Sequence, residues 1–375
     1  MKHPVKISRA LLIQAVAAGL LFFSCTGIKE PVLIGLLSGL SGGNADLGEA
    51  GRNGALIAVD EANSQGGAAG HPVVLVVRDD GNDPEKARSG ARELIRQRVV
   101  AIVGPFNTSM TEAAMEVTEE AGQVLFTPTA TAMQLVGKDD YLLRLNSTSR
   151  ENAEDYADFM FSRRNYRRIS IAADLQNQSF TESWYVEFRK VFRRLQGEIL
   201  DVVWFDSRQL SGYGQMTASL LASRPDALLF IANSVDVARI SQQIRKQDQE
   251  TPILAVEWAG TQQLIELGGK AVDGVEVLQI FDPFDRREKF LAFREQYRHR
   301  FGSDPSFSSI LAYDAVRVVL EAWTRREKGE SMKEAILRNN PYQGLQQEIR
   351  LDANGDSRRV TTFVRVSGQE FIKAP

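Results

Sequence analysis

The chain has 375 residues, of which 43% are apolar and 25% are charged, and its formal net charge is −3. This composition is that of an ordinary globular protein, which excludes general disorder, and it argues against nucleic acid as a partner because such partners require a basic surface. At roughly 100–200 residues per domain, the length favours two domains.

The first 24 residues have the pattern of an export signal. Lys2, Lys6 and Arg9 form a basic start, and residues 10–23 (ALLIQAVAAGLLFF) form an apolar run. That run is shorter than the roughly 20 residues of a membrane-spanning helix. We therefore predict a cleaved signal peptide over residues 1–24, and the mature chain would carry a net charge of −6.

The only cysteine of the chain, Cys25, directly follows this segment. The stretch LFFSC resembles the lipobox of bacterial lipoproteins, with Phe22 at the position where leucine is usual. We predict that Cys25 is lipidated and becomes the N-terminus of the mature protein. The alternative is an ordinary signal peptide followed by an incidental cysteine.

Strands and helices are expected to alternate along the mature chain. Residues 30–40 predict a buried strand, and residues 48–67 a helix with one face of small residues, suited to close packing on a sheet. Residues 72–80 have the continuous apolar pattern of a doubly covered strand, and Asp83-Pro84 is a good start for the next helix. The further expected strands are 99–104, 124–127, 168–173, 199–205, 226–231 and 252–256, and the further helices 108–121, 151–164, 180–196, 212–223, 235–247 and 261–268.

This alternation predicts an α/β fold built of parallel, right-handed βαβ units. The C-terminal part departs from it. Residues 346–366 alternate apolar and polar residues on both sides of Asn354-Gly355, which is a strong signal for a β-hairpin.

Polar, glycine-rich loops follow three of the expected strands, at residues 38–48, 104–109 and 127–132. In a doubly wound sheet, ligands bind beyond the carboxyl ends of the strands. Backbone N–H groups, hydroxyls and helix N-termini at that edge can bind a carboxylate or phosphate without lysine or arginine. For one loop, helix capping alone is the simpler explanation, but three such loops favour a shared anion site.

Enzymatic readings have little support in the sequence. After export the chain keeps His71 and His299, and neither follows the end of an expected strand, which argues against a catalytic triad or a zinc site. Neither a G-x-G-x-x-G sequence nor a P-loop is present. We expect no cofactor, no metal and no catalytic residue, although a pair of carboxylates acting as acid and base stays open.

Five segments, taken in order, resemble the leucine/isoleucine/valine-binding protein family, the substrate-binding proteins of ABC transporters. They are IGLLSGLSGGNADLGEAGRNGALIAVDEANSQGGAAGHPVVLVVRDDGNDPEKA, VAIVGPFNTSMTEAA, GQVLFTPTATAMQL, LIELGGKAVDGVEVL and SFSSILAYDAVRVVLEA. The resemblance implies a type I periplasmic-binding fold, with two doubly wound βαβ lobes, three crossings and a ligand cleft between the lobes. Lobe 1 would comprise residues 31–147 and 282–342, and lobe 2 residues 148–281 and 343–375.

The resemblance also implies which residues contact an amino-acid ligand. The loop after the third strand and the hydroxyl group after the fourth would hold the carboxylate, and Glu257 would pair with the α-ammonium; a solvated loop acid is the alternative for Glu257. Trp258 would line the pocket or cover the hinge. The implied site residues are Asn107, Thr108, Ser109, Thr129, Ala130, Thr131, Phe180, Asn233, Glu257 and Trp258.

Three departures from the family pattern leave the side-chain specificity open. Leu47 replaces the aromatic residue of the first loop, and Asn233 with Ser234 replaces the aromatic residue after the strand at 226–231. In the loop at 174–184, Phe180 or Gln178 would take the place of the family's aromatic residue.

We expect an exported, lipid-anchored solute-binding protein at the periplasmic or outer face of the cell envelope. It would capture an amino acid or a similar small zwitterion by lobe closure and deliver it to the permease and ATPase subunits of an ABC importer. A ligand-sensing receptor component of the same fold is the alternative, and an enzyme is the least favoured reading.

Overall fold

The structure, a computed structural model, describes residues 29–42, 45–206, 208–209 and 213–375. The predicted signal peptide and Cys25 lie outside these ranges. Within them, no helix combines the length and the hydropathy needed to cross a membrane.

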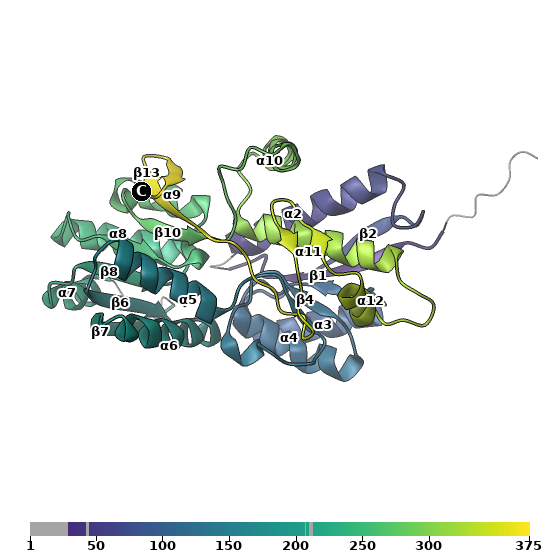
Figure 1. Cartoon of the computed structure of the whole chain (residues 1–375), viewed down its shortest axis with the longest axis horizontal. Helices are drawn as coiled ribbons and strands as arrows, with labels where there is room; N and C mark the ends of the chain where they lie inside the picture. Colours follow the sequence, from purple (N-terminus) through teal and green to yellow (C-terminus); the bar gives the residue numbers. More distant parts are fainter. Residues whose placement is uncertain (1–28, 43–44, 207, 210–212) are drawn as a thin grey trace, which may run out of the picture.

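The first half of the molecule is built on a parallel sheet that, in the described part of the chain, has five strands in the order β2-β1-β3-β4-β5 (Figure 1). The strands are β1 (Val32–Ser38), β2 (Val73–Asp79), β3 (Ile102–Val103), β4 (Leu125–Thr127) and β5 (Leu142–Arg144). The helices of this half are α2 (Ala45–Ser64), α3 (Pro84–Arg96), α4 (Thr108–Ala121), α10 (Glu288–Phe301), α11 (Phe307–Thr324) and α12 (Met332–Arg338).

The second half contains a sheet with the strand order β14-β13-β10-β9-β8-β6-β7. Its strands are β6 (Arg168–Asp174), β7 (Glu198–Phe205), β8 (Ala227–Ile231), β9 (Ile253–Ala255), β10 (Glu276–Gln279), β13 (Thr362–Ser367) and β14 (Glu370–Lys373). Strands β6 to β10 are parallel, and β13 and β14 are antiparallel. The helices are α5 (Ser149–Asp158), α6 (Gln178–Arg194), α7 (Gly214–Ala222), α8 (Ser234–Gln247) and α9 (Gln262–Gly268), so the predicted α/β fold of βαβ units is confirmed.

The chain passes between the two halves after β5, again after β10, and a third time before β13, where the yellow C-terminal segment extends from the first half to the second in Figure 1. Before this third crossing, β11 (Tyr342–Gln343) and β12 (Glu348–Ile349) form a small antiparallel pair.

The predicted hairpin around Asn354-Gly355 is wrong as a sheet element, although the turn exists. Across it only Leu351 and Ser357 pair, and β13 pairs with β10 and β14 instead. The turn packs against β5, because Arg144 donates its backbone N–H to the carbonyl oxygen of Gly355 at 2.9 Å. The contact between this turn and β5 therefore outweighs the local Asn-Gly signal in determining which strands pair.

The third crossing lies later in the chain than the expected boundary after residue 342. Arg359 pairs with Asp314 of α11 at 2.8 Å, whereas the hydroxyl of Thr361 donates to Asp155 of α5 at 2.7 Å. We propose lobes that comprise residues 31–147 with 282–359, and residues 148–281 with 360–375.

Two other expectations need correction. The strand at 73–79 is not doubly covered: β2 is the edge strand of its sheet, and Val74 is 43% exposed. The small-residue face of α2 packs mainly on helix α11 and less on the sheet. The two helices approach so closely that a Cβ added to Gly54 would lie 1.9 Å from the backbone oxygen of Ser309. In both cases the tertiary structure determines which other elements pack against the strand or the helix.

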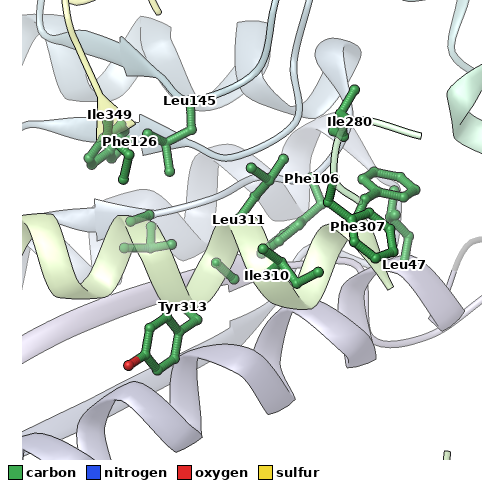
Figure 2. Close-up of a cluster of buried hydrophobic side chains, with 14 of the residues drawn as sticks. Leu47, Phe106, Phe126, Leu145, Ile280, Phe307, Ile310, Leu311, Tyr313 and Ile349 are labelled. Carbon is green, nitrogen blue, oxygen red and sulfur yellow. The ribbon is translucent and has the colours of Figure 1, made fainter. Parts of the chain in front are cut away.

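The core of the first half reaches the boundary between the halves along α11. Figure 2 shows Ile310, Leu311 and Tyr313 on this helix, with Phe307 at its start beside Phe106 and Leu47. These last three side chains are buried, and they bring an apolar wall to the carboxyl edge of the first sheet.

Candidate functional site

A small cavity lies between the two halves, at the carboxyl ends of their strands. Its volume is about 20 Å³, which is room for about one water molecule. The first half contributes residues from α2, from the loops after β3, β4 and β5, and from the start of α11; the second half contributes the start of α6 and the turn after β9. The lining residues are Leu47, Phe106, Asn107, Thr108, Thr129, Asn146, Asn177, Phe180, Glu257, Trp258 and Phe307.

The N-terminal end of α4 lies at this cavity, where Asn107 and Thr108 line the wall. Asn107 is the N-cap: its side-chain oxygen accepts from the backbone N–H of Met110 at 2.8 Å, and its amide nitrogen donates to Asn82 at 2.7 Å. Asn107 is therefore a structural cap that also lines the cavity. Thr108, the next residue, is 1% exposed, and its hydroxyl has no hydrogen-bond partner among the described residues. A hydroxyl beside a helix N-terminus is suited to a ligand carboxylate.

Glu257 lies on the opposite wall, in the 3₁₀ turn Glu257–Ala259 that follows β9. It is 3% exposed, which rules out the alternative of a solvated loop acid. Its Oε1 accepts from the side-chain amide of Asn152 at 2.8 Å, and its Oε2 is buried without a hydrogen bond to any described residue.

Burial raises the pKa of Glu257 to about 7. The backbone N–H of Glu257, the amide of Asn152 and the nearby indole of Trp184 oppose this shift and lower the pKa. A carboxylate that is buried without a cation is unfavourable, and a cationic ligand group would relieve the cost.

Aromatic side chains close the cavity on the side of the second half. Phe180, near the start of α6, meets Trp258 edge to face, with ring centroids 5.7 Å apart and an interplanar angle of 84°. Both rings are buried and line the cavity, so Trp258 belongs to the pocket wall. Together with Leu47, Phe106 and Phe307 they form an apolar surround for the polar groups.

Six of the ten predicted site residues line the cavity: Asn107, Thr108, Thr129, Phe180, Glu257 and Trp258. The other four lie beside it in protein contacts. The hydroxyl of Ser109 donates to Asn177 at 3.2 Å, and the hydroxyl of Thr131 lies 3.0 Å from that of Ser149. Ala130 is buried in the core of the first half, and Asn233 caps α8 by accepting from the backbone N–H of Asp236 at 2.9 Å. Ligand contacts by all ten residues stay predictions.

Four lining residues were missed from the sequence: Phe106, Asn146, Asn177 and Phe307. Asn146 follows β5, a strand of only three residues that the apolar pattern did not indicate. Because ligands bind beyond the carboxyl ends of strands in such a sheet, knowledge of β5 is enough to select Asn146. Asn177 lies in the loop after β6 and was reachable by the same rule, whereas Phe307 comes from a distant part of the chain.

Direct hydrogen bonds join the two halves on both sides of the cavity. On one side the carboxylate of Asp46 in α2 accepts from the hydroxyls of Ser234 and Thr261, each at 3.1 Å. On the other side Ser109 meets Asn177, and the hydroxyl of Ser179 donates to Glu112 at 2.5 Å. These bonds hold the two halves in a closed arrangement around the cavity.

The described residues contain no group of three or more His, Cys, Asp or Glu side chains that could hold a metal ion. The polar groups of the cavity are hydroxyls, amides and one carboxylate. Chemically, this set is suited to a small molecule that carries both an anionic acceptor and a cationic donor of hydrogen bonds.

Known proteins provide an independent comparison. Over 359 residues the chain is 23% identical to the leucine-, isoleucine-, valine-, threonine-, and alanine-binding protein of Pseudomonas aeruginosa, and the match covers 95% of this chain and 94% of that protein. The structure of the present chain is similar to that of a branched-chain amino acid transporter substrate-binding protein from Streptococcus pneumoniae in complex with isoleucine. The TM-score is 0.85 and the sequence identity is 21%, and the match covers 91% of this chain and 98% of the other.

A solute-binding protein of an ABC transporter from R. palustris, in complex with benzoate, has the same fold with a TM-score of 0.81, 16% identity and coverage of 92% and 95% of the two chains. At such identities the likeness shows the fold alone. One fold thus holds an amino acid in one protein and a simple aromatic acid in another, so the ligand has to be argued from the site.

Residues 31–370 match the family of periplasmic binding proteins, and this range covers nearly all of the described chain. The match agrees with the two sheets, the three crossings and the enclosed cavity between the halves. The resemblance seen in the sequence is therefore confirmed, and the chain belongs to the periplasmic binding protein family.

Proposed function

We propose that this protein captures an amino acid, or a similar small zwitterion, between its two halves and delivers it to the permease and ATPase subunits of an ABC importer. The observation that supports this proposal is a pair of buried polar atoms on the two halves' walls of one cavity, neither of which has a hydrogen-bond partner among the described residues. The Thr108 hydroxyl, at the N-terminus of α4, is suited to the carboxylate. The Oε2 atom of Glu257 is suited to the ammonium.

The energies of these contacts are of the right size. A hydrogen bond to a charged group contributes about 1.5–3 kcal/mol. Three or four such bonds, less the cost of ordering the ligand and the side chains, support micromolar binding, which corresponds to roughly −8 kcal/mol. The ligand's poles bind to different halves, so neither half alone provides this affinity.

The size of the cavity implies a conformational change. A space of about 20 Å³ holds about one water molecule, so an amino acid enters only after the halves have separated. The ligand then binds a closed form better than an open form and shifts the equilibrium between them. The closed, ligand-bound form is also the form that a partner protein recognises. Binding, closure and release together require no catalysis.

Amino-acid binding is tested with the mature chain by a thermal-shift screen of the twenty amino acids. A ligand raises the melting temperature by mass action, so at least one amino acid should produce a concentration-dependent shift. Absence of any shift at millimolar concentrations would contradict the proposal.

Glu257→Gln tests the assigned ammonium contact. The substitution removes the charge and keeps the shape, so calorimetry at pH 8 should show at least tenfold weaker binding of the amino acid that the screen selects. Glu266→Gln is the matched control, because Glu266 is an exposed acid on the neighbouring α9. Equal affinities of the wild type and Glu257→Gln would remove Glu257 from the site.

We also propose export of the chain and lipidation at Cys25, on the basis of the basic start, the apolar run and the LFFSC sequence. Cys25→Ser should release the protein from membranes into the soluble fraction, which fractionation and immunoblotting measure. Retention of the variant on membranes would mean that another feature holds the protein there.

A further inference from the structure

A third polar atom on the cavity wall has no hydrogen-bond partner in the part of the chain that the structure describes, and it belongs to Asn146, which neither the sequence analysis nor the proposed contacts use. Asn146 lies after β5 and is 1% exposed. Its Nδ2 donates to the carbonyl oxygen of Thr129 at 3.3 Å, and this bond fixes the orientation of the amide. The amide oxygen, Oδ1, is buried without a partner among the described residues.

The chemistry of this atom is restricted, since an amide oxygen only accepts hydrogen bonds. The cavity therefore carries two buried acceptors without partners, Oδ1 of Asn146 on the first half and Oε2 of Glu257 on the second. Among the described lining residues there is no lysine, arginine or histidine that could donate to either of them. With no cationic side chain on the described wall beside them, both acceptors are suited to a cationic donor group of the ligand.

We propose that Asn146 is a specificity-determining residue that accepts a hydrogen bond from the α-ammonium of the ligand, so that the site selects amino acids over carboxylic acids without an amino group. This inference rests on the proposed function. A primary ammonium has three N–H donors and can serve both halves at once, one bond to Glu257 and one to Asn146. The Thr108 hydroxyl, at the N-terminal end of α4, remains available for the carboxylate.

The selectivity follows from the cost of unmade hydrogen bonds. A carboxylic acid that lacks the amino group leaves both buried acceptors unpaired on closure, and a site built to bond a polar group discriminates strongly against a ligand that lacks it. The Asn146 contact also lies on the first half, so the ammonium as well as the carboxylate would connect that half to the ligand. Removal of this acceptor should reduce the preference for the amino group and leave carboxylate recognition intact.

The experiment compares two variants on two ligands at pH 8. Asn146→Leu removes both the acceptor and the bond to Thr129, whereas Asn146→Asp keeps an acceptor and loses the amide donor to Thr129. The probes are amino acids and their des-amino acids: L-valine with 3-methylbutanoate, or L-alanine with propanoate, as the thermal-shift screen directs. Calorimetry or tryptophan fluorescence gives the dissociation constants, and Asn63→Leu, which removes an amide bonded to the backbone of Val73 in the first half, controls for lost stability.

The expected result is a roughly 10- to 100-fold loss of amino-acid affinity in Asn146→Leu, with less than a threefold change for the des-amino acid. Asn146→Asp should bind the amino acid within threefold of the wild type, or more tightly. If Asn146→Asp loses as much affinity as Asn146→Leu, or if Asn146→Leu weakens both ligands equally, Asn146 acts only through its bond to Thr129 and the inference is overturned. If the wild type binds no amino acid at all, the proposed function fails first and this inference fails with it.

Discussion

Burial of the Glu257 carboxylate destabilises the fold, whereas the same carboxylate is the group proposed to bind the ammonium of the ligand. Its carboxyl group is buried against Asn152 and Trp184, and burial raises the pKa to about 7 from an ordinary value of 4.5. The folded, unliganded protein therefore binds a proton at this site more tightly than the unfolded chain does. Above pH 7 the buried charge of Glu257 lowers the free energy of unfolding. This loss of stability is progressively removed as the pH falls towards 4.5.

The same shift makes ligand affinity depend on pH in the opposite direction. An ammonium pairs with the charged carboxylate, so below pH 7 the site has to lose a proton before it binds. We expect the affinity for the amino acid to be roughly 30-fold lower at pH 5.5 than at pH 8, as measured by calorimetry. Binding near neutral pH should also release a proton, which is detected as a dependence of the observed heat on the ionisation enthalpy of the buffer.

Glu257→Gln separates this effect from that of other buried acids such as Asp46 and Asp80, whose pKa values are also raised by burial. In this variant the affinity should be weak and nearly independent of pH. At pH 8 the unliganded variant should be more stable than the wild type by up to about 3 kcal/mol, because the buried charge is gone. A wild-type affinity that is unchanged between pH 5.5 and 8 would mean that Glu257 does not titrate with binding.

The helices α2 and α11 carry the cavity's apolar wall, and they approach closely because α2 presents small residues. Gly54 lies against the backbone of Ser309 at the start of α11, and Gly51 lies against the ring of Phe106, which lines the cavity. At α11 the hydroxyl of Ser308 donates to the carbonyl oxygen of Leu47, at the N-terminal end of α2, at 2.5 Å. The spacing of these two helices therefore sets the positions of Leu47 and Phe307 in the wall.

Gly54→Ala should separate the two helices. The added Cβ would lie 1.9 Å from the backbone oxygen of Ser309, which cannot move as a flexible side chain would. We expect a loss of stability of about 1–3 kcal/mol or more in denaturant unfolding, together with weaker ligand binding. Gly214→Ala is the matched control, because a Cβ there meets nothing within 4 Å at the start of α7; similar losses in both variants would show that α2–α11 packing is not the cause.

For the molecule as a whole, hydrogen bonds between side chains of the two halves contribute to the closed arrangement. The carboxylate of Asp46 lies between the N-terminal ends of α8 and α9, where Ser234 and Thr261 donate to it. Burial raises the pKa of Asp46, and the hydroxyls and the backbone N–H of Leu47 oppose the shift. These bonds favour the closed arrangement, and the measured affinity depends on how much of the unliganded protein is competent to bind.

Asp46→Ala should reduce the closed fraction of the unliganded protein. Two hydrogen bonds between the halves are lost, so we expect a larger radius of gyration without ligand in small-angle X-ray scattering and roughly three- to thirtyfold weaker binding. Asp60→Ala is the control on the same helix, since Asp60 pairs with Arg300 within the first half. An unchanged scattering profile and affinity in Asp46→Ala would show that this contact does not control closure.

Local chemistry made several features of the chain predictable. Helix α4 runs over Thr108–Ala121 as expected, because Asn107 caps its start and Gly122, in the left-handed conformation, ends it. Helix α3 begins at Pro84 with Asp83 accepting from two backbone N–H groups. The alternation of strands and helices, and with it the edge where a site forms, also follows from patterns within short stretches of chain.

What the sequence by itself determined is the set of elements, the edge of the sheet that holds the site, and the presence of hydroxyl and amide groups at that edge. Only the tertiary structure decided the neighbours: that β2 is an edge strand, that α2 packs on α11, and that the segment around Gly355 packs against β5 and does not form a longer hairpin. The same holds for the unpartnered atoms of Thr108, Asn146 and Glu257, which share one cavity although they are far apart in the chain. Caps and turns depend on interactions over a few residues, whereas burial and the lack of a partner depend on everything that surrounds an atom.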